Sequence, residues 1–182
     1  IDPSQKMDEK GIIIINDKGK IKSIGKKVKI TDAPKSAEKI DLKGNIAIPG
    51  IVDMKAFVGE PGFEYKENFR TLSQAALAGG FTRVCAMPNT SPAIDSPELI
   101  RYIVNRSNEC PIHIHPIGAV TKSQKGKELT EMKAMLNEGA VAFSDDGVPI
   151  ENSTVLRNAL LYASMFHGNI KIINHAEDLT LK

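Results

Sequence analysis

Two segments of the sequence end in side chains that could bind a metal ion. Asp145-Asp146 follows the apolar run at residues 140–144, and His175 follows Ile172-Ile173. A carboxylate and an imidazole are ordinary ligands for a divalent metal such as zinc. A catalytic zinc site takes three protein ligands, so Asp146 and His175 supply at most part of one. The alternative is that Asp145-Asp146 forms only a polar turn before Gly147.

A His-x-His sequence also occurs, at residues 113–115. Alternate residues of a strand share a face, so the two imidazoles could in principle chelate a metal. They precede Pro116, however, and lie well before the expected strand end near Val120. We therefore interpret His113 and His115 as half-buried strand residues rather than ligands.

Five apolar segments alternate with helical segments from residue 49 onward. The predicted strands are residues 51–57, 82–87, 112–120, 140–144 and 170–174. Between them, apolar residues recur at helical spacing, and Ser96-Pro97 supplies an N-cap and a first-turn proline for one of the helices. Strand starts recur about every 30 residues, which is the length of one βα unit.

Such alternation predicts an α/β fold with a parallel sheet. A complete (β/α)8 TIM-type barrel takes about 250 residues, so five strands are the first part of one. The alternative is an open doubly wound sheet, but no GxGxxG follows the first strand. In a barrel, chemistry gathers at the carboxyl ends of the strands, where Lys55, Asn89, Asp146 and His175 are expected.

The first 48 residues have a different pattern. Short apolar runs at residues 11–15, 21–24 and 46–48 are separated by turn sequences, which predicts part of a small antiparallel β-sandwich module. We expect a domain boundary between residues 1–48 and 49–182. The strand-to-turn start and the apolar end lead us to expect further sequence on both sides.

Composition excludes some classes of partner. The net charge of +2 comes from 24 basic and 22 acidic residues that are mixed along the chain, so we expect no nucleic-acid or membrane-surface partner. No apolar stretch approaches the roughly 20 residues that a membrane helix needs, and the cytoplasm is the expected location. Cys85 and Cys110 lack CxxC spacing and are expected to be reduced thiols without a chemical role.

Five motifs, taken in order and with their separations, resemble dihydroorotase, a family of the amidohydrolase superfamily. They are Ile48-Pro49-Gly50-Ile51-Val52-Asp53, Glu60-Pro61-Gly62, Met87-Pro88-Asn89-Thr90, Phe143-Ser144-Asp145-Asp146-Gly147 and His175-Ala176-Glu177-Asp178. The resemblance implies a TIM-type barrel that interconverts carbamoyl aspartate and dihydroorotate in pyrimidine synthesis, usually with zinc. By the same resemblance, Asp146 and His175 match metal ligands, and Asn89 matches a substrate-contacting residue.

The first metal motif departs from the family. The family has His-x-His at the end of the first strand and, two residues on, an Arg that binds the substrate carboxylate; this sequence has Lys55-Ala56-Phe57 and then Gly59. An ammonium has no lone pair and a phenyl ring offers no donor, so Lys55 and Phe57 occupy lost ligand positions. The family's remaining ligands and its general base would lie after Lys182, and we assign no catalytic residue.

These departures leave two hypotheses open. The first is a weakly active or non-catalytic homologue, a pseudoenzyme that partners aspartate carbamoyltransferase, as family members with eroded metal motifs do. The second is an active cyclic amidohydrolase of dihydroorotase or hydantoinase type, with a cyclic amide as substrate and a single zinc ion. Either protein is expected to be an oligomer. The Lys55 ammonium is expected either to pair with Asp146 in place of the metal or to extend into solvent.

Overall fold

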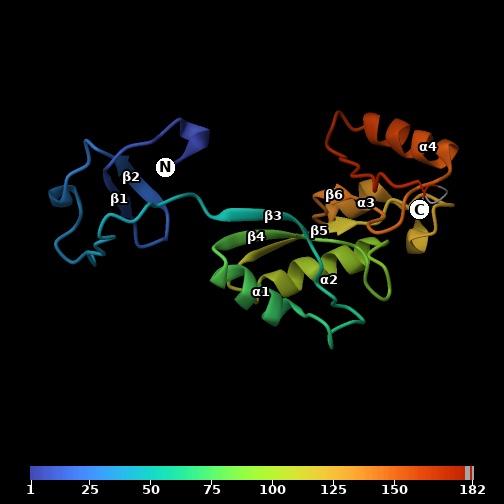
Figure 1. Cartoon of the computed structure of the whole chain (residues 1–182), viewed down its shortest axis with the longest axis horizontal. Helices are drawn as coiled ribbons and strands as arrows, with labels where there is room; N and C mark the ends of the chain where they lie inside the picture. Colours follow the sequence, from blue (N-terminus) through green and yellow to red (C-terminus); the bar gives the residue numbers. More distant parts are fainter. Residues whose placement is uncertain (179–180, 182) are drawn as a thin grey trace. The chain divides into compact units, whose positions relative to one another are not determined.

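The computed structural model describes residues 1–178 and residue 181 (Figure 1). The chain divides into two compact units, Ile1–Pro49 and Gly50–Lys182. None of the helices in the described part of the chain is long and apolar enough to cross a membrane. The second unit carries all of the predicted site residues.

The first unit contains a two-stranded antiparallel sheet. Strand β1 (Ile12–Ile15) pairs with β2 (Ile21–Gly25), and two short 3-10 helices, η1 (Pro3–Gln5) and η2 (Ile30–Asp32), flank the pair in sequence. The Asn16 side chain closes the turn by accepting hydrogen bonds from the amides of Lys18 and Lys20.

The strand predicted at residues 46–48 is wrong. Ile46 and Ile48 are exposed and belong to no sheet ladder among the described residues. The amino group of Ile1 donates to the Ala47 carbonyl over 2.7 Å. A strand forms only where a neighbouring backbone supplies a series of partners, which an apolar run by itself does not guarantee.

The second unit is built on a four-stranded parallel sheet. Its strands are β3 (Ile51–Ala56), β4 (Phe81–Ala86), β5 (His113–Gly118) and β6 (Ala142–Phe143). They pair in sequence order, β3-β4-β5-β6. A doubly wound sheet reverses its strand order at a switch point, whereas a barrel adds each new strand on the same side. The order therefore confirms the predicted incomplete barrel and excludes the doubly wound alternative.

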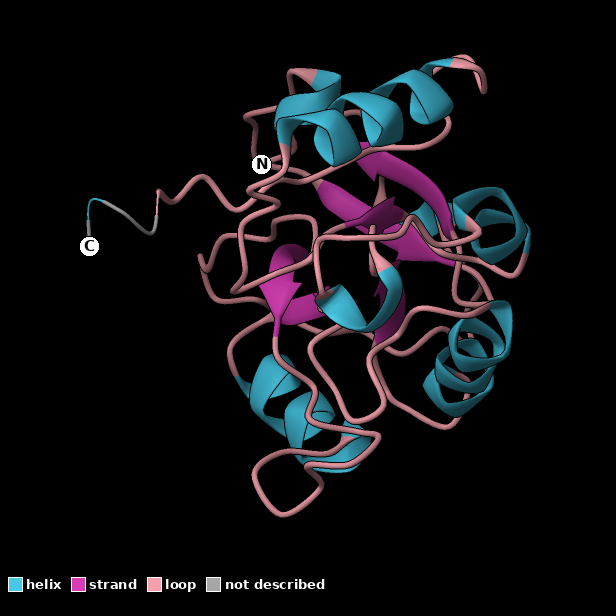
Figure 2. Ribbon diagram, turned by 90° about the vertical axis from the view of Figure 1, so that its right-hand side faces the viewer, coloured by secondary structure: helices cyan, strands magenta, loops and turns pink. Residues whose placement is uncertain are grey.

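Helices follow the strands and lie around the sheet (Figures 1 and 2). They are α1 (Phe69–Ala78), α2 (Pro97–Ser107), η3 (Lys122–Gln124), α3 (Met132–Asn137) and α4 (Ser153–Ser164). The predicted start of α2 is confirmed, because Ser96 is the N-cap and Pro97 is the first helical residue. Asn68 and Asn152 cap α1 and α4 in the same way, each accepting bonds from two backbone amides.

The two faces of the sheet belong to different clusters. On β4, Val84 and Ala86 join the large core that packs against the helices. Cys85 and Met87 alternate with them and contact a smaller cluster with Ile117 and Ala142. The period-2 alternation of a strand therefore gives one face to the helices and leaves the other for the inner side of the curved sheet.

The fifth predicted strand, at residues 170–174, does not form among the described residues. Ile172 makes a single parallel bridge to Phe143, and β6 itself contains only two residues. The segment still runs beside β6, with Ile173 donating to the Phe143 carbonyl and Phe143 donating to that of Lys171, each over 2.8 Å. The prediction placed the segment correctly and overstated its regularity.

Candidate functional site

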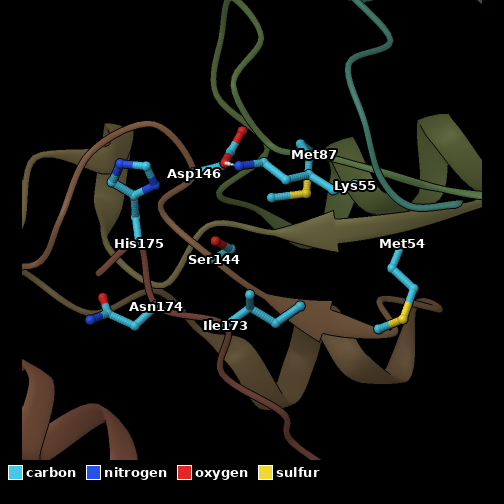
Figure 3. A pocket seen from close by; sticks show the side chains of 8 residues that line it. All are labelled: Met54, Lys55, Met87, Ser144, Asp146, Ile173, Asn174 and His175. Atoms are coloured by element: carbon cyan, nitrogen blue, oxygen red, sulfur yellow. Dashed lines mark ion pairs between the residues drawn. The ribbon is translucent and has the colours of Figure 1, made fainter. Parts of the chain in front are cut away.

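A small pocket lies where β3, β4 and β6 end and the segment around His175 passes them (Figure 3). Its volume is about 60 Å³. The residues that line it are Met54, Lys55, Met87, Ser144, Asp146, Ile173, Asn174 and His175. The carboxyl ends of parallel strands meet at one rim of a barrel, so side chains more than 100 residues apart in sequence are brought together there.

The central contact of this pocket is an ion pair. The Nζ atom of Lys55, near the end of β3, lies 2.8 Å from Oδ1 of Asp146, which follows β6 (Figure 3). The Asp146 side chain is only 10% exposed, whereas that of Lys55 is 62% exposed. Fully exposed pairs contribute about 0–1 kcal/mol, but a mostly buried carboxylate that loses its cation is left uncompensated. Of the two alternatives left open for Lys55, the structure shows the pairing with Asp146.

Asn89, after β4, approaches the same carboxylate. Its Nδ2 atom donates to Oδ2 of Asp146 over 3.4 Å, on the oxygen that Lys55 does not contact. The Asn89 Oδ1 atom is buried and, within the described residues, is the one buried side-chain N or O atom without a hydrogen-bond partner. An orphaned buried acceptor costs free energy unless a donor reaches it, so this atom marks a place for a ligand or a water.

His175 lies in the same pocket but takes a different partner. Its Nε2 atom is 3.2 Å from Oε2 of Glu177, and its side chain is about one-third exposed. In Figure 3 the only ion pair drawn joins Lys55 to Asp146. The structure thus brings three predicted site residues, Asn89, Asp146 and His175, to one rim. The His175 imidazole contacts Glu177, whereas Asp146 contacts Lys55 and Asn89.

Phe57, at the second lost ligand position, does not line the pocket. Its ring packs against that of Phe63, with 6.4 Å between the centroids. Gly59 is also part of the altered segment: its φ is +76°, and a Cβ atom there would meet the Glu67 carbonyl oxygen at 2.4 Å. Position 59 therefore accepts no side chain in this conformation.

Asp145 is distinct from its neighbour Asp146. It is buried, and Oδ1 accepts bonds from the amides of Val120 and Thr121 at 2.8 and 3.0 Å, while Oδ2 accepts from the Thr121 hydroxyl. Burial raises the pKa of the Asp145 carboxyl, and these hydrogen bonds partly offset that rise. Asp145 holds the loop after β5 and takes no part in the pocket.

Glu60 anchors the segment after β3. It is buried, and it accepts bonds from the Tyr102 hydroxyl (2.7 Å), the Arg106 Nε (3.3 Å) and the Phe69 amide (3.2 Å). Burial, together with the hydrogen bond to Glu60, raises the pKa of Tyr102. The motif Glu60-Pro61-Gly62 gave no signal for these partners, of which Tyr102 and Arg106 belong to α2 and Phe69 begins α1.

The His113 and His115 rings stack on β5 with 6.3 Å between their centroids. Neither lines the pocket. His115 is half-buried, as predicted, while His113 is exposed.

Zinc does not fit the described residues on their own. Among them, no three His, Cys, Asp or Glu side chains are grouped so that they could hold a metal ion. Asp146 is already paired with a cation, and Phe57 supplies no donor atom. Asp146 and His175 therefore remain two donors in one pocket rather than a zinc site.

Comparison with known proteins agrees with this architecture. Residues 44–182 match the family described as "Dihydro-orotase-like". The whole chain is 43% identical to a dihydroorotase of Syntrophus aciditrophicus, of which it covers 42%, and 97% of it is 42% identical to a dihydroorotase of Caldicellulosiruptor saccharolyticus, of which it covers 40%. The chain thus spans about two fifths of the length of these relatives.

Among solved structures, the L-hydantoinase (dihydropyrimidinase) of Arthrobacter aurescens is similar, with a TM-score of 0.62. The match covers 74% of this chain and 28% of that one at 23% identity. At that identity the likeness concerns the fold alone. It supports an incomplete TIM-type barrel.

Proposed function

The chain belongs to the dihydroorotase-like family, and from that premise we propose that it is a pseudoenzyme of pyrimidine biosynthesis. In this proposal the protein is weakly active or non-catalytic, lies in the cytoplasm, and serves as a binding partner of aspartate carbamoyltransferase. Its barrel then acts as a scaffold for the partner enzyme.

The observation that carries the proposal is the ion pair between Lys55 and Asp146. The Lys55 ammonium neutralises the carboxylate that the family resemblance assigns to the metal. A zinc ion at that carboxylate would have to displace the ammonium or lie beside it, and two neighbouring cations repel each other. The built-in cation gives Asp146 a partner without any metal.

The segment that should bind the substrate carboxylate supports the same proposal. In the family an Arg occupies the position of Gly59, where a guanidinium can grip a carboxylate with two hydrogen bonds. The close contact at Gly59 leaves no room for such a side chain. The changes therefore affect metal binding and substrate binding together, and either loss alone would impair catalysis.

A second candidate function is an active mononuclear zinc cyclic amidohydrolase of dihydroorotase or hydantoinase type. The observation in its favour is that Asp146 and His175 line one pocket, with the unpartnered Oδ1 of Asn89 near Asp146. A three-ligand site would need a further donor besides these two. The chain's own residues do not complete it among those described.

Turnover separates the two candidates. The rate of dihydroorotate hydrolysis by the full-length protein should stay at or little above the uncatalysed background, and added zinc should not raise it. Binding to aspartate carbamoyltransferase should occur without zinc. Zinc-dependent turnover at the rate of ordinary enzymes, with kcat above about 1 per second, would favour the second candidate and overturn the first.

A further inference from the structure

The loop after β5 reaches the main chain of Asp146. The half-buried side chain of Gln124 donates from Nε2 to the Asp146 carbonyl oxygen over 3.5 Å. In the described part of the chain, no backbone amide donates to that oxygen. Gln124 therefore contacts the main chain of the residue whose carboxylate pairs with Lys55.

The backbone of this loop is strained where it makes the contact. Ser123 and Gln124 have φ values of 51° and 55°, in the left-handed region. Residues with a Cβ atom seldom adopt this conformation, and each one costs free energy. Strained residues of this kind persist only where the surrounding structure holds them, and they cluster at functional sites. Other contacts must therefore fix the position of Gln124.

Hydrogen bonds at both ends of the loop supply those contacts. The Ser123 amide donates to the Asp95 carboxylate over 2.8 Å, and the Gly126 amide donates to the Thr121 hydroxyl over 2.9 Å. The Thr121 amide in turn donates to the carboxylate of Asp145 over 3.0 Å. Thr121 and Asp145 are both buried, so their part of this arrangement does not depend on which surfaces are open to solvent.

The contact to the carbonyl matters because the next residue does not restrict the peptide. Gly147 has a φ of +78°, and a Cβ atom there would meet no heavy atom within 4 Å. A glycine in open space permits many orientations of the peptide that precedes it. The carboxylate of Asp146 contacts Lys55 and Asn89, and Gln124 contacts the carbonyl of the same residue. Together these contacts fix Asp146 at both its side chain and its main chain.

We propose that Gln124 is a positioning residue for the ion pair of Lys55 and Asp146. It fixes the peptide between Asp146 and Gly147 so that the carboxylate faces the ammonium, and the strained loop holds Gln124 in place. The inference rests on the proposed function, in which this ion pair takes the place of the metal. It assigns to the loop after β5 the task of keeping Asp146 paired.

The reactivity of the Lys55 amine tests the proposal in the full-length protein. A lysine paired with a carboxylate reacts slowly with acetic anhydride, because only the free amine attacks. We expect Gln124→Ala to raise the acetylation rate of Lys55, followed by mass spectrometry, about threefold, the effect of one weak hydrogen bond. The rates at the exposed Lys18 and Lys66 should not change. Gln74→Ala, at an exposed position of α1, is the matched control and should leave Lys55 at the wild-type rate.

A second variant separates the side chain from the backbone. Gln124→Asn keeps an amide and suits the left-handed conformation better than glutamine does, but it is one methylene shorter. It should keep the loop folded and still lose the contact to the Asp146 carbonyl. We therefore expect the acetylation rate of Lys55 to rise as much in Gln124→Asn as in Gln124→Ala.

Asp146→Asn provides the reference for complete loss of the pair and should raise the rate at Lys55 more than either Gln124 variant. If Asp146→Asn raises that rate and the Gln124 variants do not, the positioning role is overturned while the ion pair and the proposed function stand. A rise at Lys18 and Lys66 as well would show general loosening and would also overturn the positioning role. If Asp146→Asn leaves Lys55 unchanged, both this inference and the ion pair that carries the proposed function are overturned.

Discussion

The ammonium of Lys55 lies 2.8 Å from the carboxylate of Asp146, although the two residues are 91 positions apart in sequence. One residue ends the first strand of the incomplete barrel, and the other follows the fourth. The pair occupies the rim where a barrel enzyme performs its chemistry. In this protein the charge of the carboxylate is balanced by a side chain of the same chain.

A double-mutant cycle on Lys55 and Asp146 should give a coupling free energy of about 1–2 kcal/mol, above the range of fully exposed pairs because the carboxylate is mostly buried. Lys55→Met should destabilise the protein, and Asp146→Asn in the same chain should recover part of the loss. Urea unfolding measures each free energy. Lys127→Met, an exposed lysine without an ion pair, is the control. Additive effects of the two substitutions would show that the pair contributes nothing.

Gly59→Ala should destabilise the protein by more than about 2 kcal/mol. A positive φ costs a non-glycine residue about 1–2 kcal/mol, and the clash with the Glu67 carbonyl adds to it. Gly168→Ala is a matched control, because Gly168 has the same φ of +76° with nothing within 4 Å of the added Cβ. Equal losses in the two variants, measured by urea unfolding, would mean that the close contact at Gly59 is not important.

Replacement of Asp145 should lower the stability of the protein, because its carboxylate binds the backbone of the loop after β5. Asp145→Ala leaves the buried amides of Val120 and Thr121 without an acceptor and should cost about 3 kcal/mol. Asp145→Asn keeps an acceptor oxygen of the same shape and should cost under about 1 kcal/mol. Chemical denaturation distinguishes the two. A loss as large for Asn as for Ala would point to a requirement for the negative charge itself.

Acid should destabilise the second unit through His115. Burial, and then the positive charge of Arg83 and the neighbouring His113, lower its pKa below the ordinary 6.5. The unfolded chain therefore binds a proton more readily, so the stability that neutral His115 allows is complete above pH 6.5 and declines as the pH falls below it.

Melting temperatures between pH 7.5 and 5 measure this effect. His115→Gln should flatten the decline, whereas His167→Asn, at an exposed position with a left-handed backbone that Asn tolerates, should leave it unchanged. A wild-type melting temperature that does not fall below pH 6.5 would be inconsistent with this role of His115.

Much of the barrel was predictable because its signals are local. Alternation of apolar residues placed β3, β4 and β5 within about two residues, and Ser96-Pro97 identified the start of α2. The segments at 46–48 and 170–174 match strands in their apolar residues but do not form regular ones. Ile46 and Ile48 belong to no ladder among the described residues, whereas Ile172 makes one bridge to β6, which is itself only two residues long. The length of a strand depends on hydrogen-bonding partners along the neighbouring backbone, which the segment's own sequence does not specify.

The membership of the site was predictable, but of its contacts only the pair of Lys55 and Asp146 was among the alternatives that the sequence offered. The expected strand ends brought Lys55, Asn89 and Asp146 together, because parallel strands finish at one rim. Asp145 and Asp146 have the same side chain, and only their partners distinguish them: Asp145 accepts bonds from Val120 and Thr121, whereas Asp146 pairs with Lys55. The roles of Gly59 and Glu60 depend on contacts with Glu67, Tyr102 and Arg106. No local sequence pattern predicts these contacts.

Zinc stoichiometry tests the central claim, that the ammonium of Lys55 stands where a metal ligand would be needed. The full-length protein would be dialysed against zinc, and the metal bound per chain would be measured by plasma mass spectrometry. We expect far less than one zinc per chain in the wild type. About one zinc per chain, retained after dialysis into zinc-free buffer, would contradict it.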